Sequence, residues 1–195
     1  MVLFLNKTPS KDIELKTEKR MYLNFNELPG DARIWVYQSE KELTDAQAKE
    51  IAEKTRAFCE SWTSHGDSLR ASSLILYNRF IIFGVDSPSD GICGRAIDAS
   101  ARFIMELGGK YQTDFLNRNI VFFYDPVLKK ARPMPLAQTK ELIGKGEILP
   151  ETPVFNTLIQ RKRDLLDKWI IPAGESWLKS RFPKENAYQS ANNGR

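Results

Sequence analysis

Apolar and polar positions follow two different spacings near the start of the patterned part of the chain, and these predict a strand and then a helix. Residues 32–37 (Ala-Arg-Ile-Trp-Val-Tyr) are rich in β-branched and aromatic side chains, which favours a strand. Thr44 and Gln47 have the spacing of a capping box, so a helix should begin here. Apolar positions then recur at steps of three and four and make one helical stripe: Ala48, Ile51, Ala52, Thr55, Phe58, Cys59 and Trp62. We expect residues 64–67 to end this helix.

The next segments predict a hairpin and a second helix. Two apolar runs, at 69–76 and 80–85, flank Tyr77-Asn78-Arg79 and indicate a β-hairpin. The second run is almost continuously apolar, which is typical of a strand covered on both faces. A second helix should follow the loop at 86–91, with Gly108-Gly109 as its end.

Shorter elements are predicted beyond the second helix. Residues 120–124 indicate a strand, and 129–134 an edge strand, because its prolines cannot donate to a sheet. Residues 136–143 indicate a short helix. A further helix is expected to begin at Thr152-Pro153 and to reach Trp169, with a strand over 154–156 as the alternative for its start.

The order of elements over residues 32–124 is that of a ferredoxin-like βαββαβ unit. We therefore predict an α+β fold: an antiparallel sheet with helices packed on one face, to which residues 125–182 add a C-terminal α/β extension. Residues 1–20 are interpreted as an N-terminal extension, either disordered or upstream of the true start of translation. Residues 21–182 then form a single α+β domain, and 183–195 a flexible tail.

Composition and charge narrow the classes of function. The chain has 195 residues and a formal net charge of +4, but residues 21–160 carry 16 basic and 18 acidic groups, so the positive surplus lies near the two ends. A nucleic-acid partner is therefore not expected, and weak binding through the terminal segments is the alternative. Two cysteines and one histidine predict neither a disulfide framework nor a closed zinc site, and no cofactor is expected. Without an apolar run long enough for a signal core or a membrane span, we expect a soluble cytoplasmic protein.

Several runs, in a fixed order, carry a resemblance to a known family. They are Leu-Pro-Gly-Asp-Ala-Arg-Ile-Trp-Val-Tyr-Gln at 28–38, Trp-Thr-Ser-His-Gly at 62–66, Tyr-Asn-Arg-Phe-Ile-Ile at 77–82, Val-Phe-Asn-Thr-Leu at 154–158, and Ser-Trp at 176–177. Over residues 21–182 the chain resembles a family of short bacterial proteins of unestablished function. Many members carry the label "ABC transporter ATPase", which implies nucleotide hydrolysis.

The residues argue against that label. A phosphate-binding P-loop needs Gly-x-x-x-x-Gly-Lys followed by Ser or Thr, because backbone amides, the lysine and the hydroxyl hold the phosphates and magnesium. At Gly109-Lys110 the next residue is Tyr111, and Ile104 stands where the first glycine belongs. Gly144-Lys145-Gly146 also fails the pattern. We do not expect ATPase activity.

The candidate site is the loop and helix start at 86–98. Amides at a helix N-terminus favour an anion or a thiolate, and Arg95 could add a forked donor, so ligand-binding roles are predicted for Asp86, Gly91, Gly94 and Arg95. Cys93 is a candidate catalytic nucleophile with His65 as base and Asp98 as their partner. The family's pattern here, Ser-Gly-Cys-Ser-Ile-Asp, places its cysteine at the position of Arg95 and a serine at that of Cys93. The alternative is a structural role for these residues.

Two functions follow from this site. The first is a binding or accessory module for a partner protein or a small anionic ligand at 86–98. The alternative is a thiol-dependent hydrolase or transferase that uses Cys93 and His65.

Purely structural roles are expected for several other residues. Cys59 should be a core residue, and His65 could simply interact with the carbonyls at a helix end. The basic run Arg161-Lys162-Arg163 should be a solvated face. A packed core, rather than stacking on bases, is expected for the aromatic residues Trp35, Tyr37, Phe80, Phe83, Phe122 and Phe123.

Overall fold

The first predicted strand forms at one edge of a three-stranded antiparallel sheet. In the computed structural model, which describes residues 22–87 and 91–183, this strand is β1 (Arg33–Gln38). The predicted hairpin supplies the other two strands, β4 (Ala71–Leu76) and β5 (Phe80–Val85), and the order in the sheet is β1-β5-β4. Every residue of β5 is buried, as its continuous apolar run predicts. The hairpin and its central strand are thus confirmed.

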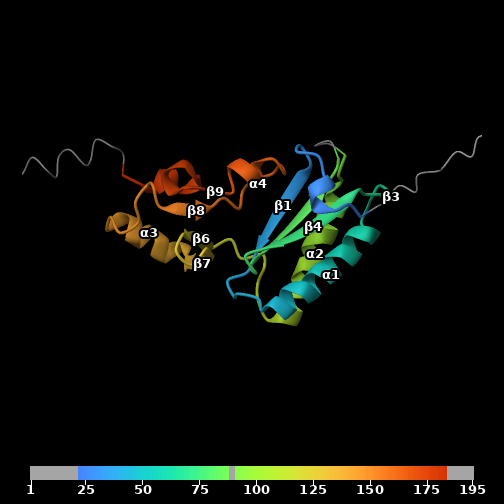
Figure 1. Cartoon of the computed structure of the whole chain (residues 1–195), viewed down its shortest axis with the longest axis horizontal. Coiled ribbons are helices and arrows are strands. Elements are labelled where there is room, and N and C mark those ends of the chain that lie inside the picture. The colour runs from blue at the N-terminus through green and yellow to red at the C-terminus, as the bar shows by residue number, and fades with distance from the viewer. Residues whose placement is uncertain (1–21, 88–90, 184–195) are drawn as a thin grey trace, which may run out of the picture.

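Two helices cover one face of this first sheet (Figure 1). Helix α1 (Asp45–Ser61) begins at the predicted capping box: the Gln47 amide donates to Thr44 Oγ1 over 3.2 Å, and the Thr44 amide donates to Gln47 Oε1 over 2.9 Å. Helix α2 (Gly94–Tyr111) does not end at Gly108-Gly109 as expected. It continues to Tyr111, and Gly108 serves close packing inside it, since a Cβ there would lie 2.6 Å from the Thr113 carbonyl oxygen. Gln112, with φ of 52°, provides the left-handed end.

A small hairpin follows α1 where only the end of the helix was expected. Its strands are β2 (Thr63–Ser64) and β3 (Asp67–Ser68). His65 and Gly66 form the turn, with φ of 54° and 89°. Two consecutive positive φ angles are the requirement of the type I′ turns that join two-residue hairpins.

The fourth strand of the predicted βαββαβ unit joins a different sheet. It is β6 (Ile120–Asp125), and the order in this second antiparallel sheet is β7-β6-β8-β9. The outer edge of β1 is not available to it, because the Ile34 amide donates to the Gln160 carbonyl and the Gln38 amide to the Phe115 carbonyl. The fold is α+β, but the strands are divided between two sheets rather than placed in one.

The remaining elements build the second sheet and its cover. Strand β7 (Lys130–Pro135) lies at the sheet edge, as its prolines predict. Helix α3 (Leu136–Gly144) is also confirmed, and three 3₁₀ helices complete the fold: η1 (Phe25–Glu27), η2 (Ala173–Glu175) and η3 (Trp177–Arg181).

The long helix predicted from Thr152-Pro153 to Trp169 is wrong. This segment contains β8 (Pro153–Phe155), a single helical turn α4 (Asp164–Asp167), and then β9 (Ile170–Pro172). The alternative of a strand at its start is confirmed. Phe155 and Trp169 contribute to one apolar surface from separate elements, with ring centroids 5.0 Å from that of Phe80.

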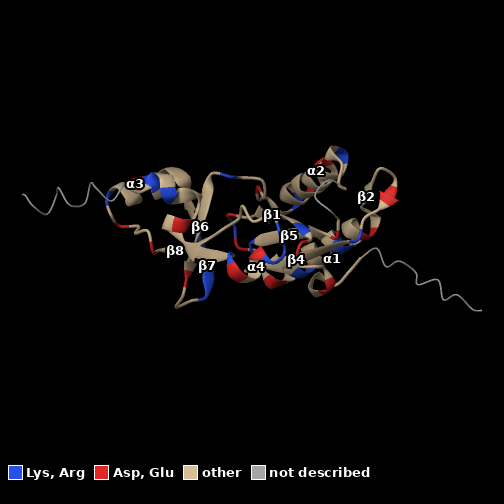
Figure 2. Cartoon of the chain, turned by 90° about the horizontal axis from the view of Figure 1, so that it is seen from above, with Lys and Arg blue, Asp and Glu red and all other residues tan. Residues whose placement is uncertain are grey.

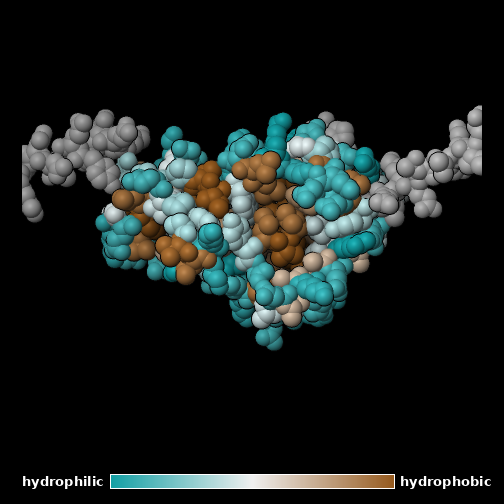
Figure 3. Space-filling view, viewed as in Figure 1, coloured by the Kyte–Doolittle hydropathy of each residue, from teal (hydrophilic) through white to brown (hydrophobic). Residues whose placement is uncertain are grey.

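Aromatic side chains fill the space between the two sheets. Phe80 from the first sheet lies 4.9 Å from Phe122 of the second, measured between ring centroids. On the face seen in Figure 3, apolar side chains gather on either side of this junction. Phe80, Phe83, Phe122, Phe123 and Tyr37 are all buried, as a packed core requires.

The basic run at 161–163 is not simply a solvated face. Lys162 Nζ donates to the carbonyls of Asn26 and Leu28, and Arg161 Nη1 donates to the Asp31 carbonyl over 2.9 Å. These side chains fasten the C-terminal segment to the chain that precedes β1. In Figure 2 basic and acidic residues are interspersed over both sheets.

The N-terminal extension predicted at 1–20 lies outside the described residues, as do residues 184–195 of the tail predicted at 183–195. None of the helices in the described part of the chain is long and apolar enough to cross a bilayer.

Candidate functional site

A hollow of about 420 Å³ lies where the β2–β3 hairpin meets the N-terminus of α2. We refer to it as the α2 hollow. Three residues predicted for the site, His65, Cys93 and Arg95, line it together. The complete lining is Thr63, His65, Gly66, Cys93, Arg95, Ala96 and Ala99. The fold therefore brings a thiol, an imidazole-bearing residue and a guanidinium-bearing residue to one place.

Two hydrogen bonds fix the small hairpin to the helix. The Cys93 amide donates to Ser64 Oγ over 3.0 Å, and Trp62 Nε1 donates to the Ala96 carbonyl over 2.9 Å. Ser64 and Trp62 are both buried, so these bonds are shielded from water. The turn that carries His65 is consequently held against the first turn of α2.

Polar groups around the Cys93 sulfur favour its thiolate form. The Ser64 hydroxyl contributes most, and the backbone amides of Ala96, His65 and Arg95 add to it. Together they lower the pKa of Cys93 from the ordinary 9.0 to about 7. Hydrogen bonds to the charged form of a group stabilise that form, and a helix N-terminus does so in the same sense.

Two hydrogen bonds hold Ser64 against the loop that precedes α2. Its oxygen accepts from the Cys93 amide, while its proton points to the Gly91 carbonyl over 3.5 Å, at the long limit of a hydrogen bond. Ser64 is a site residue that the sequence analysis missed, although the Ser-His-Gly-Asp turn pattern at 64–67 points to a tight hairpin that would fix its position.

The second cysteine has the opposite environment. Cys59 is fully buried on the inner face of α1, as predicted, and burial raises the pKa of its thiol to about 12. It is thus a protonated core residue.

The other predicted site residues lie outside the hollow. Asp98 does not line it, so the proposed set of Cys93, His65 and Asp98 is not assembled there. Asp86 forms an ion pair with Arg70, with Arg70 Nη1 2.6 Å from Asp86 Oδ2. Gly91 accepts from Ser64, and Gly94 is the first residue of α2; both shape the helix start without lining the hollow.

His65 and Arg95 remain open to a ligand. His65 occupies the hairpin turn rather than a helix end, which corrects the expectation that it interacts with the last helical carbonyls. Arg95 is exposed, and its side chain makes no hydrogen bond or ion pair with any residue that the structure describes. An exposed guanidinium beside a thiolate is suited to bind an anionic group.

Comparisons with known proteins return no match from family models, curated proteins or solved structures. The resemblance to short bacterial proteins therefore stays a prediction. Within residues 22–87 and 91–183, no three side chains of the metal-binding types gather into a group that could hold an ion.

Proposed function

We propose that the α2 hollow binds a small anionic ligand next to a reactive thiol, and that the protein is a thiol-dependent hydrolase or transferase. The observation that carries this proposal is the set of groups around Cys93: the Ser64 hydroxyl and three backbone amides stabilise negative charge on the sulfur. A module that only binds an anion needs donors aimed at the ligand. Here the donors serve the thiolate, which favours the enzyme over the simple binding module.

Each residue of the hollow has a role in such a reaction. Arg95 binds the anionic part of the substrate, because its exposed guanidinium can form a forked pair. The Cys93 thiolate attacks an acyl carbon and forms a thioester, while the bond to the leaving group breaks. His65 gives that group a proton. Water then hydrolyses the thioester and restores the thiol, or an acceptor nucleophile takes the acyl group and makes the protein a transferase.

The pH dependence of alkylation tests the thiolate. Iodoacetamide reacts with thiolates, so the rate at Cys93 should rise with pH and reach half its plateau near pH 7. Mass spectrometry separates the labelled peptide of Cys93 from that of Cys59. A midpoint near the ordinary thiol value of 9.0 would contradict an activated nucleophile.

The charge of the reagent tests the role of Arg95. Iodoacetate carries a carboxylate and iodoacetamide does not, so Arg95→Gln should slow the first reagent several-fold more than the second. The matched control is Arg102→Gln, an exposed arginine further along α2 that does not line the hollow. Equal losses with both reagents, or equal effects of both variants, would contradict an anion site at Arg95.

An activated ester distinguishes an enzyme from a binding module. With p-nitrophenyl acetate, the enzyme should release one equivalent of p-nitrophenolate in a burst and then turn over more slowly. Cys93→Ser should abolish the burst. A burst without later turnover in the presence of water or amine acceptors would support a reactive thiol but contradict hydrolase or transferase activity.

A further inference from the structure

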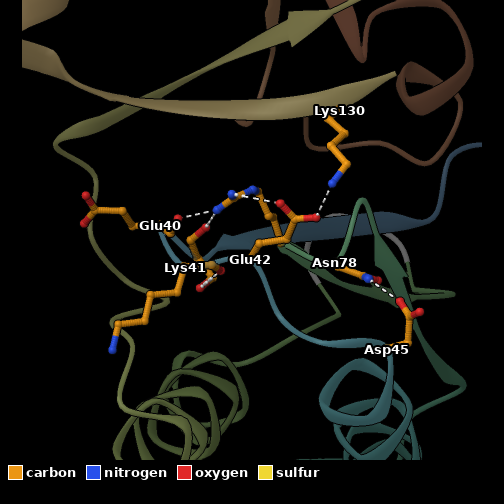
Figure 4. A network of polar contacts seen from close by, with 8 residues as sticks. Glu40, Lys41, Glu42, Asp45, Asn78 and Lys130 are labelled. Carbon is orange, nitrogen blue, oxygen red and sulfur yellow. Dashed lines mark hydrogen bonds and ion pairs between the residues drawn. The ribbon is translucent and has the colours of Figure 1, made fainter. Parts of the chain in front are cut away.

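A second cleft lies on the other side of the fold, where the two sheets meet. Two hollows of about 220 and 630 Å³ share the residues Glu42, Asn78 and Lys130, and we refer to them together as the junction cleft. Its walls come from three parts of the chain: the segment before α1, the β4–β5 turn, and the start of β7 (Figure 4). None of the residues proposed for thiol chemistry lines it.

A buried arginine forms the floor of the cleft. Arg79 is only 8% exposed, which is unusual for an arginine. Its Nη1 donates to the carbonyls of Ser39 and Glu40, and its Nη2 lies 3.4 Å from Glu42 Oε2. The side chain therefore has carbonyl partners on one side and a single, loosely placed carboxylate on the other.

Glu42 is a carboxylate shared between two cations. Its Oε1 accepts from Lys130 Nζ over 3.0 Å, and its other oxygen faces Arg79 (Figure 4). Lys129 also lines the cleft and has no ion-pair partner among the described residues. Because the Glu42 side chain is 42% exposed, it can leave this position without breaking the core. It occupies a place that an external anion could take.

Neutral and acidic hydrogen-bonding groups lie in the junction cleft beside its cations, Arg79, Lys129 and Lys130. Asn78 Nδ2 donates to Asp45 Oδ1 over 2.7 Å, which leaves Asn78 Oδ1 and the second Asp45 oxygen as acceptors (Figure 4). These acceptors suit hydroxyl groups. Tyr77, Asn78 and Lys129, all with φ between 50° and 54°, hold the surrounding turns in the left-handed region. Positive φ angles are what tight hairpin turns require, so these turns present the cleft residues from fixed positions.

We propose that the junction cleft is a ligand site for a phosphorylated polyhydroxy compound, such as a sugar phosphate. The phosphate replaces the Glu42 carboxylate at Lys130 and Arg79, and Lys129 adds a third cation. The hydroxyl groups of the ligand donate to Asp45 and Asn78. Glu42 is thus an internal anion that competes with the ligand, which makes the site different from an ordinary basic patch.

Binding to the full chain tests the site, with glucose 6-phosphate, inorganic phosphate and glucose as probes in calorimetry. Glucose 6-phosphate should bind more tightly than either of the others. Lys130→Met should weaken it about tenfold, the cost of one charge-assisted contact. The control is Lys145→Met, since Lys145 directly follows α3, pairs with Glu141 and does not line the cleft. Asp45→Asn should weaken glucose 6-phosphate but not phosphate.

The decisive variant is Glu42→Gln, which removes the competing carboxylate. It should bind glucose 6-phosphate several-fold more tightly, whereas loss of a merely structural residue would weaken binding. Lys129→Met, which leaves Arg79 and Glu42 intact, should weaken binding and serves as the second variant if Glu42→Gln unfolds. Absence of binding, equal binding of all three probes, or equal losses in Lys130→Met and Lys145→Met would overturn the proposal. Cys93→Ser should leave this binding unchanged, so failure here does not affect the thiol site.

Discussion

The two cysteines of this protein lie at opposite extremes of thiol chemistry although both belong to the same helical layer. Cys59 is packed inside α1, where burial raises its pKa to about 12. Cys93 precedes α2 at the surface, where Ser64 and backbone amides lower its pKa to about 7. The comparison teaches that reactivity here comes from what surrounds the sulfur: desolvation opposes the thiolate, and aimed donors favour it.

The largest expected effect is on alkylation of the folded protein at pH 7.5. Cys93 should react at least about a thousandfold faster with iodoacetamide than Cys59, because only Cys93 is both accessible and ionised. Peptide mass spectrometry after timed quenching measures both rates in one sample. Unfolding in urea is the control, since both thiols should then react at similar rates. Comparable alkylation rates of Cys93 and Cys59 in the folded protein would contradict the difference in environment between the two thiols.

Substitution of Cys59 should lower the stability of the fold more than substitution of Cys93, the reverse of their order in reactivity. Cys59→Ala removes a sulfur from a packed core and should cost about 1–3 kcal/mol of unfolding free energy. Cys93→Ala changes a partly exposed side chain and should cost much less than Cys59→Ala at pH 6. Urea unfolding followed by tryptophan fluorescence measures both values. Similar losses would mean that Cys93 has a structural role of its own.

Ser64→Ala tests whether the hydroxyl controls the thiolate. Because this hydroxyl is the largest cause of the lowered pKa, its loss should raise the pKa of Cys93 and slow alkylation at pH 7 by about fivefold. Ser68→Ala is a matched control, since Ser68 lies in the facing strand of the same hairpin and is exposed. An unchanged alkylation profile in Ser64→Ala would assign the shift to the helix amides alone.

The smallest effect is on the pH dependence of stability. As pH rises, ionisation of Cys93 stabilises the folded state, whereas the raised pKa of Cys59 destabilises it. A lowered pKa at Cys93 stabilises the folded state as pH rises from about 7 to 9; this contribution is absent at lower pH and complete above 9. The raised pKa of Cys59 destabilises the folded state above about pH 9, where the unfolded thiol ionises first.

Urea midpoints at pH 6.5 and 9 measure this linkage. Cys93→Ser should remove a stabilising contribution between these two pH values, so its midpoint should fall relative to that of the parent chain as pH rises. No change in the difference between variant and parent would contradict the lowered pKa.

Local patterns predicted those parts of the fold that depend on neighbours in sequence. The capping box of α1 and the β4–β5 hairpin need only residues a few positions apart, and both are confirmed. The segment from 152 to 169 was mispredicted as a helix because the spacing of Phe155 and Trp169 fits a helical stripe. In the fold, Phe155 ends β8 and Trp169 directly precedes β9, and both reach the same apolar surface.

The sequence predicted several residues of the candidate site, but not how they come together in the fold. The helix start with Cys93 and Arg95 follows from the sequence, since glycines and a loop precede an apolar helical stripe. The place of Ser64 does not, because it depends on a two-residue hairpin packed against a helix that begins thirty residues later. Asp98 was included on spacing alone, and the turn of α2 places it outside the hollow.

The sequence by itself determined the α+β class, the two long helices, the buried central strand and a thiol at a helix start, because these follow from periodicity and capping. Only the tertiary structure decided that β6 leaves the first sheet, since the edge of β1 is closed by the carbonyls of Phe115 and Gln160. It also decided that Ser64 and His65 meet Cys93. Contacts between distant segments depend on which edges and faces remain unpaired after the local elements have formed, and that information is not contained in any short stretch of sequence.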